Sequence, residues 1–182
     1  GAYQRSKRKY PSWLDPRMDE PGSIHCVLVS NHEGYLLFER WYAPGADDTS
    51  RAEWRSALRE ASSENIRQFA GQVASKDKSD AKDADDTFVA LHRGHHVLYC
   101  CVSDIVVYIV GTGEYDELGL LEVMRGLMQC LRGVCRKAPS EALLGEHFGE
   151  VCLMVDEIIN DGVLESTDWE VVRRGMKLKA VA

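Results

Sequence analysis

No stretch of the sequence carries the roughly 20 apolar residues in a row that a helix needs to cross a bilayer. The basic N-terminus is not followed by an apolar segment, so no secretory signal is recognisable. An excess of positive charge is also missing. The net charge is −7, which argues against sequence-independent binding to nucleic acid. These absences favour a cytosolic protein whose partners are not nucleic acids.

The sequence also lacks the spacing of Cys and His residues that is typical of a metal site. The six cysteines contain no CxxC pair, and most of them lie within apolar segments, which is typical of buried free thiols in a reducing compartment. Three histidines near two of the cysteines match no standard zinc spacing. We therefore predict neither a metal nor another cofactor. The residues considered as ligands are His92, His95, His96, Cys100 and Cys101.

No catalytic constellation can be assembled. Cys130 or Cys135 as a nucleophile would need a paired base, and the sequence does not identify one. Asp156 and Glu157 are adjacent, so on a helix their side chains diverge by about 100° and do not form a carboxylate dyad. The Gly-Thr-Gly at residues 111–113 lacks the Lys-Ser/Thr of a phosphate loop. A binding or assembly module is favoured over an enzyme.

A hydrophobic fraction of 45% in 182 residues suits one globular domain. We expect it to span residues 23–176, between a basic, aromatic-containing tail at 1–22 and a C-terminal tail at 177–182. Residues 72–86 are rich in Lys, Asp, Ala and Ser, have almost nothing to bury, and predict a mobile charged loop. The tail at 1–22 is either native or fused, and its charge suits contact with anionic lipid.

Short apolar runs rich in β-branched residues predict strands. The first two, at 23–30 and 35–42, flank Gly34 and predict a hairpin. The next three are separated by three residues and by one, and connections this short force antiparallel neighbours. They cover residues 87–92, 96–103 and 105–110.

Four segments carry apolar residues at helical spacing and predict helices. In the first, the apolar stripe consists of Trp54, Leu58, Ala61 and Phe69. The third ends at Gly162, which can adopt the left-handed conformation of a helix cap. The predicted helices cover residues 50–69, 115–136, 139–159 and a short segment that begins near Thr167 or Asp168.

Glycine recurs every seven residues in the second predicted helix, at Gly119, Gly126 and Gly133. This spacing places the three on roughly one stripe. Each glycine costs about 1 kcal/mol relative to alanine in a helix interior. The stripe therefore predicts that another backbone packs very close to this helix, with chance placement as the alternative.

The order of elements resembles the longin (SNARE-like) fold of the small subunits of vesicle-coat adaptors. Residues 23–29 and 34–42 resemble the opening hairpin of that family, and residues 107–118 resemble its last strand and following helix start. The resemblance implies an α/β domain whose five-stranded antiparallel sheet is flanked by helices on both faces, in the order β-β-α-β-β-β-α-α plus a short C-terminal helix. The residues that carry the family signature are Tyr115, Asp116, Glu117, Leu118, Asp156, Glu157, Ile158, Gly162, Leu164 and Glu165.

Three segments distinguish the branches of the family. Residues 154–165 are similar to the coatomer zeta signature, but zeta subunits have two glycines and one more apolar residue between the acidic pair and Leu164-Glu165. Residues 52–56 and 114–118 are more similar to the longin-type small subunit of the TSET (plant TPLATE) complex. The resemblance therefore favours TSET first, coatomer zeta second and an adaptor sigma subunit third.

A structural role without a reaction is what the resemblance implies. Such a subunit packs against the N-terminal solenoid trunk of a large subunit, within a heterotetrameric core that contains other coat subunits. The complex works on membranes, in clathrin-linked endocytosis at the plasma membrane for TSET and in Golgi–ER traffic for coatomer. The chain would be cytoplasmic and peripheral, with membrane contact either indirect or through the tail at 1–22.

Aromatic side chains are enriched at the centres of such interfaces. We expect partner anchors among Trp41, Tyr42, Trp54 and Trp169, although the same four residues fit core positions equally well. A longin domain of a GTPase-regulating complex, which pairs its sheet edge with another longin domain, stays open as a rival. A stand-alone enzyme is a weaker rival.

Overall fold

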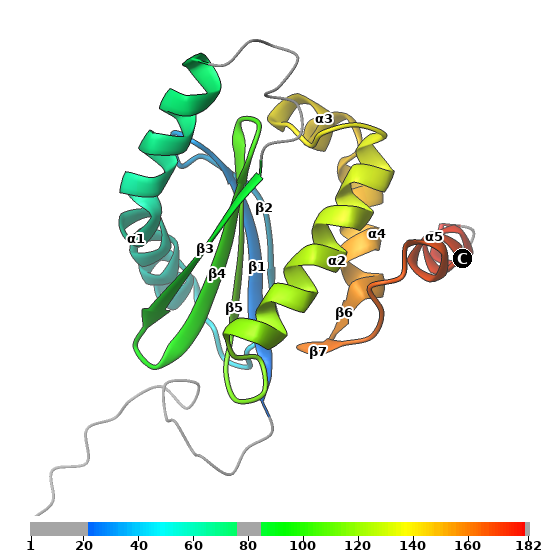
Figure 1. The fold of residues 1–182 in the computed structure, drawn as a ribbon. Coiled ribbons are helices and arrows are strands. Elements are labelled where there is room, and N and C mark those ends of the chain that lie inside the picture. Colours follow the sequence, from blue (N-terminus) through cyan, green and yellow to red (C-terminus); the bar gives the residue numbers. More distant parts are fainter. Residues whose placement is uncertain (1–21, 76–84, 181–182) are drawn as a thin grey trace, which may run out of the picture.

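The computed structural model describes residues 22–75 and 85–180, which form one sheet with helices on both faces (Figure 1). The five strands lie in the order β2-β1-β5-β4-β3, and each is antiparallel to its neighbours. The predicted fold class is therefore confirmed. The strands are β1 (Ile24–Asn31), β2 (Leu36–Trp41), β3 (Asp85–His92), β4 (His95–Val102) and β5 (Ile105–Gly111).

The middle of the sheet is apolar on both sides. All seven residues of β5 are buried, and β1 is buried except at His25, which explains why both strands appear in the sequence as nearly continuous apolar runs. Val27 of β1 lies opposite Ile109 of β5, so the opening hairpin joins the last strand. Gly34 turns the hairpin with a φ of 89°, a conformation that favours glycine.

One face of the sheet is covered by α1 (Asp48–Ser75) alone. Trp54, Leu58 and Phe69 of the predicted stripe are buried there. The assignment of Ala61 to this face was wrong, because Ala61 is exposed and the next residue, Ser62, is fully buried. The Ser62 hydroxyl lies 2.9 Å from the hydroxyl of Tyr108, and this hydrogen bond satisfies a polar group inside the core.

The opposite face is covered by α2 (Glu117–Cys135), α3 (Glu141–Glu146) and α4 (Phe148–Ile158). The prediction of one long helix over 139–159 was wrong, since the helix breaks at His147, where φ is −107° and ψ is 22°. Gly145 and Gly149 flank the break, and two glycines within five residues lower the helix propensity there.

After α4 the chain forms a small hairpin of β6 (Ile159–Asn160) and β7 (Val163–Leu164), then α5 (Trp169–Lys179) packs outside α2 and α4. Of the expected loop at 72–86, residues 72–75 belong to α1 and residues 85–86 to β3. The rest of that loop and residues 1–21 lie outside the described residues. Among the helices described, none combines the length and the apolar character that a membrane span requires.

Candidate partner-binding surface

Several signature residues meet at the corner where α4, the β6–β7 hairpin and the sheet come together. The hydroxyl of Tyr115 accepts a hydrogen bond of 2.9 Å from the backbone N–H of Leu164. The carbonyl of Gly162 accepts one of 2.7 Å from the N–H of Ile24, at the start of β1. A Cβ on Gly162 would lie 2.7 Å from the carbonyl oxygen of Ile24, so glycine is required here for space as well as for its φ of 80°.

The hairpin turn itself is Asp161-Gly162, and both residues have positive φ. Two central residues of this kind make a type I′ turn, the two-residue turn that suits a tight β-hairpin. The short spacing seen in the sequence therefore corresponds to a complete, tight hairpin. Glu165 continues it, because its N–H donates a 2.8 Å hydrogen bond to the carbonyl of Ile158.

The adjacent acids on α4 point in different directions, as expected for neighbours on a helix. Asp156 forms an ion pair of 3.0 Å with Arg40 on β2 and so links α4 to the sheet. Glu157 forms one of 2.7 Å with Lys179 and so links α4 to α5. The Asp156–Arg40 pair is partly exposed, so it contributes about 0–1 kcal/mol. The two acids hold elements together and share no reacting atom.

The glycine stripe on α2 receives the segment that leads into α5. A Cβ on Gly126 would collide with the side chain of Thr167 and lie 3.1 Å from its Cα. A Cβ on Gly133 would lie 2.7 Å from the indole ring of Trp169. The predicted close approach of another backbone to α2 is confirmed at Gly126, whereas the neighbour at Gly133 is a side chain. Gly119 differs, since the atom next to it is the carbonyl oxygen of Glu114 in the preceding loop.

Other signature residues support local structure. The Asp116 side chain caps α2 by accepting hydrogen bonds of 3.0 Å from the N–H groups of Leu118 and Gly119. Glu117 adds a negative charge to the first turn of α2, which the helix dipole favours. Leu118 differs from the rest because its side chain is 77% exposed.

The four aromatic residues expected as partner anchors do not form one patch. Trp54 is 4% exposed and packs edge-on against the rings of His92 and His95, so it is a core residue. Trp41 is half-buried beside α1, with the Arg51 guanidinium 5.9 Å from its ring centre. Their side chains both pack into the core on the α1 face of the sheet.

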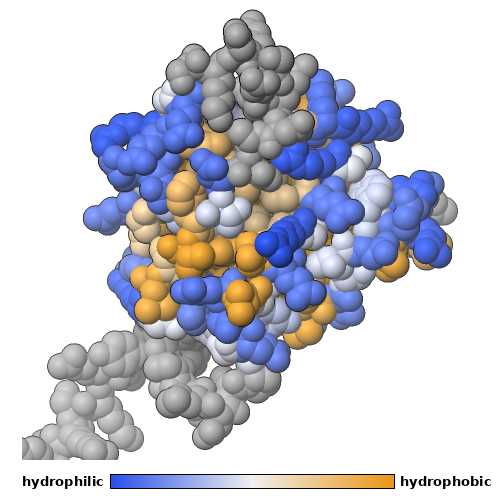
Figure 2. Space-filling model, viewed as in Figure 1, coloured by the Kyte–Doolittle hydropathy of each residue, from blue (hydrophilic) through white to orange (hydrophobic). Residues whose placement is uncertain are grey.

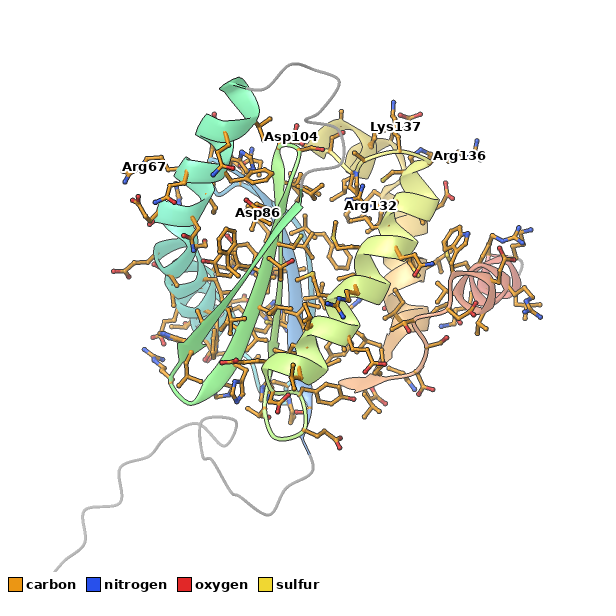
Figure 3. The ribbon with its side chains drawn as sticks, in the orientation of Figure 1. Arg67, Asp86, Asp104, Arg132, Arg136 and Lys137 are labelled. Carbon is orange, nitrogen blue, oxygen red and sulfur yellow. The ribbon has the colours of Figure 1, made fainter. Side chains whose placement is uncertain are left out.

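Tyr42 and Trp169 lie on the other side of the sheet. Tyr42 packs beside Gly162, and burial, together with the negative charge of Asp156, raises its pKa. Trp169 is half-buried and lines a groove of about 470 Å³ between α2, α4 and α5. Arg136 and Lys177 also line this groove; Figure 3 places Arg136, with Lys137, at the C-terminal end of α2.

Apolar side chains are exposed on the α2 side of β3. α2 lies over β4 and β5 and leaves part of this face open, so Val89 is 47% exposed and Leu91 is 69% exposed. A trough of about 310 Å³ separates β3 from α2, with Met124 and Met128 in its lining and Arg125 beside them. Figure 2 shows hydrophobic side chains gathered over this region. Residues 88–91 of β3 are all apolar, so the sequence does not show which face of this strand is exposed or how far α2 reaches.

The buried thiols in the described part of the chain are spread over both faces of the sheet. Cys100 belongs to the core on the α2 face and Cys101 to the core on the α1 face, so the two thiols point apart. Burial raises the pKa of Cys101 to about 12 and that of Cys130 to about 11, which keeps both as thiols at neutral pH. Within residues 22–75 and 85–180, no three His, Cys, Asp or Glu side chains are grouped as metal ligands.

Comparisons with known proteins agree with this architecture. The TSET complex member tstD of Dictyostelium discoideum is 25% identical over 157 residues, which cover 86% of this chain and 93% of that protein. Human coatomer subunit zeta-1 is 28% identical over 153 residues, covering 84% of this chain and 76% of that protein. Both branches favoured by the sequence are thus among its relatives.

A solved-structure comparison shows the same fold. A chain of a structure described as a homology model of the full-length AP-3 complex in a stretched open conformation aligns with a TM-score of 0.52 at 14% identity. The alignment covers 87% of this chain and 95% of that chain. The model of one family, described as clathrin adaptor complex small chain, matches residues 23–181, nearly the whole of the chain. This protein therefore belongs to the clathrin adaptor complex small chain family.

Proposed function

We propose that this chain is the structural small subunit of a heterotetrameric adaptor or coat core, and that it binds the N-terminal solenoid trunk of a large subunit. The observation that carries the proposal is the family match over residues 23–181, which spans every strand and helix described. The relatives bear the names of subunits of multi-subunit complexes. The chain then acts in the assembly of the complex, and no reaction is assigned to it.

The contacts that the signature residues make within the chain support this role. Tyr115, Asp156, Glu157 and Gly162 all contact other parts of the same chain, and together they fasten α4, the β6–β7 hairpin and α5 to the sheet. A domain fastened in this way presents a rigid surface to a partner. Rigid surfaces bind with less loss of conformational entropy than mobile ones.

The favoured complex is of the TSET type, acting in clathrin-linked endocytosis, with the chain on the cytoplasmic side of the plasma membrane. The tight Asp161-Gly162 hairpin supports this branch, because zeta subunits have a longer segment there. A coatomer zeta subunit in Golgi–ER traffic is the second candidate, favoured by the 28% identity to human zeta-1. Membrane contact through the tail at 1–22 belongs to the same proposal.

Trp41, Tyr42 and Trp169 stay in the proposal as partner anchors, since each is only half-buried. Trp54 is left out because its side chain already packs in the core. Alanine at each of the three, followed by co-purification with the large subunit, tests them individually. Unchanged assembly of the triple variant would remove all three from the interface.

Affinity purification of the full chain from its own cells, with quantitative mass spectrometry, tests the function. We expect two large subunits and one medium subunit of a single coat complex in amounts equal to the chain. Recovery of a second longin protein with a GTPase would instead support the GTPase-regulating class. Nucleotide turnover by the purified chain would contradict both.

A further inference from the structure

We propose that α5 binds the membrane directly, with its outward side on an anionic lipid surface. The basic side chains of this side would lie at the lipid phosphates, and two apolar side chains would enter the headgroup region. We call this surface the α5 face and define it by Val171, Arg174, Lys177 and Leu178. The inference rests on the proposed function for the expectation that the chain works at a membrane. It goes further, because the proposed function assigns membrane contact only to the tail at 1–22.

The α5 face is a side of the helix that the core does not use. Val172 and Met176 are four residues apart and are buried in the core on the α2 side of the sheet. Val171 and Leu178 are seven residues apart, so they share a different side of α5, and they are 49% and 76% exposed. Packing within the described part of the chain therefore does not explain why these two positions are apolar.

The helix is held firmly on the domain, so its outward side is preformed. Lys179 forms an ion pair of 2.7 Å with Glu157 on α4. A Cβ on Gly175 would collide with the Glu157 side chain, so α5 and α4 are in close contact there. The Asp168 side chain caps α5 by accepting hydrogen bonds of 2.8 and 3.1 Å from N–H groups of the first turn. A preformed helix loses little conformational entropy when it binds.

Positive charge is concentrated on α5, although the chain as a whole is acidic. The helix carries four basic residues and one acidic residue, whereas the net charge of the chain is −7. Two of the four basic residues form ion pairs with Glu170 and Glu157. The other two, Arg174 and Lys177, are exposed and have no ion pair with any described residue. Two uncompensated cations therefore belong to the α5 face.

Spacing places these cations among the exposed apolar side chains. Arg174 follows Val171 by three residues and precedes Leu178 by four, so it lies between them on one side of the helix. Lys177 lines the groove between α2, α4 and α5 together with Arg136, which adds a third cation without an ion pair in the described chain. Figure 2 shows hydrophobic side chains beside hydrophilic ones at the right edge of the molecule, where Figure 1 places α5.

Charge and shape together favour a lipid surface as the partner. Each Lys or Arg close to an anionic leaflet strengthens binding by about fivefold. Apolar side chains beside such cations can enter the headgroup region while the cations stay at the phosphates. α5 lies outside α2 and α4 as a ridge, which a fluid bilayer can accept without a matching groove (Figure 1). Because the same lipids repel the acidic remainder of the chain, α5 would turn toward the membrane and set the orientation of the domain.

Flotation of the full chain with vesicles tests the role of charge. The vesicles consist of phosphatidylcholine with about one-third phosphatidylserine, and pure phosphatidylcholine vesicles are the neutral reference. The charge variant is Arg174→Glu with Lys177→Glu. Its matched control is Arg67→Glu with Arg125→Glu, which changes the net charge equally at exposed positions on α1 and α2. We expect the charge variant to weaken binding to the anionic vesicles by about 25-fold or more, and the control to weaken it much less.

A second pair of variants tests the apolar contact. Leu178→Ser is matched by Leu118→Ser, because these leucines are 76% and 77% exposed on different helices. Leu178→Ser should weaken binding to the anionic vesicles by about tenfold, and Leu118→Ser should leave it unchanged. A tail variant, with residues 7–9 changed to serine, separates the two basic regions of the chain. The loss caused by the α5 charge variant should persist in the tail variant.

Thermal unfolding of each variant shows that a loss of binding is not a loss of folding. Absence of wild-type binding to the anionic vesicles would overturn the inference, and so would equal losses in the charge variant and its control. It is also overturned if only the tail variant loses binding. Loss of large-subunit capture by the α5 variants, with unchanged vesicle binding, would assign α5 to a protein interface instead. Failure of the wild type to capture any large subunit would contradict the proposed function, and it is measured separately from flotation.

Discussion

Replacing Gly126 by alanine should destabilise the protein, although the same change in most helices is stabilising. Gly126 is buried in α2, and a Cβ there would meet the side chain of Thr167 and approach its Cα to 3.1 Å. Gly71 on α1 is the matched control, because a Cβ there would have no neighbouring atom within 4 Å. Neither residue has positive φ. The two substitutions therefore differ mainly in the space available.

Two opposing effects, helix propensity and steric crowding, determine how much each substitution changes the free energy of unfolding. Alanine gains about 1 kcal/mol over glycine in a helix interior, and rather less near a helix end, where Gly71 lies. Inserting a methyl group into a closely packed site costs about 1–3 kcal/mol. Gly71→Ala should thus raise the free energy of unfolding by about 0.5–1 kcal/mol. Gly126→Ala should lower it by up to about 2 kcal/mol once the propensity gain is subtracted.

Thermal unfolding of the full chain measures both effects. A change of 1 kcal/mol shifts Tm by about 2–4 °C in a protein of this size, so the two variants should move in opposite directions. Hydrogen exchange adds a local readout. Gly126→Ala should speed exchange in α5, because Thr167 leads into that helix. Equal stabilisation by the two substitutions would refute the close approach of this segment to α2.

Three further predictions concern single side chains. Tyr115→Phe removes the acceptor of the β7 amide and should lower the free energy of unfolding by about 1–3 kcal/mol in urea titrations, with an unchanged m value. Burial lowers the pKa of His25 to about 4, so the folded state binds fewer protons than the unfolded state below pH 6.5. Stability should fall by about 3 kcal/mol between pH 7 and pH 4, and a His25→Gln variant should show a shallower fall. In native protein at pH 8, a thiol reagent should modify the half-buried Cys152 first, and Cys101 and Cys130 only after unfolding.

Periodicity in the sequence predicted much of the fold, because in these segments burial follows a regular spacing. All five strands and the order of the main helices were recognised from apolar runs and turns. The error at Ala61 and Ser62 involves residue types that conflict with their places. Ser62 is polar yet buried, because Tyr108 supplies its hydrogen bond. The sequence around Ser62 cannot reveal this partner, because Tyr108 lies 46 residues further along the chain.

The candidate surface was harder to predict for a related reason. Trp54 and Trp169 have the same side chain, but one is covered by two histidine rings and the other lines an open groove. The exposure of Leu91 depends on how much of the sheet α2 covers, which is a property of tertiary packing. In contrast, the glycine stripe was informative, since three glycines on one helix face have a cost that only close packing offsets.

The central claim is that this chain is a subunit bound to a large coat subunit, and native mass spectrometry tests it most directly. The full chain is co-expressed with the N-terminal trunk of each large subunit from the TSET and coatomer complexes of the same cells. The account predicts one stable complex containing one copy of each chain, formed with a large subunit of only one of the two complexes. A chain that stays monomeric with every trunk, or that assembles only with another longin domain, would contradict it.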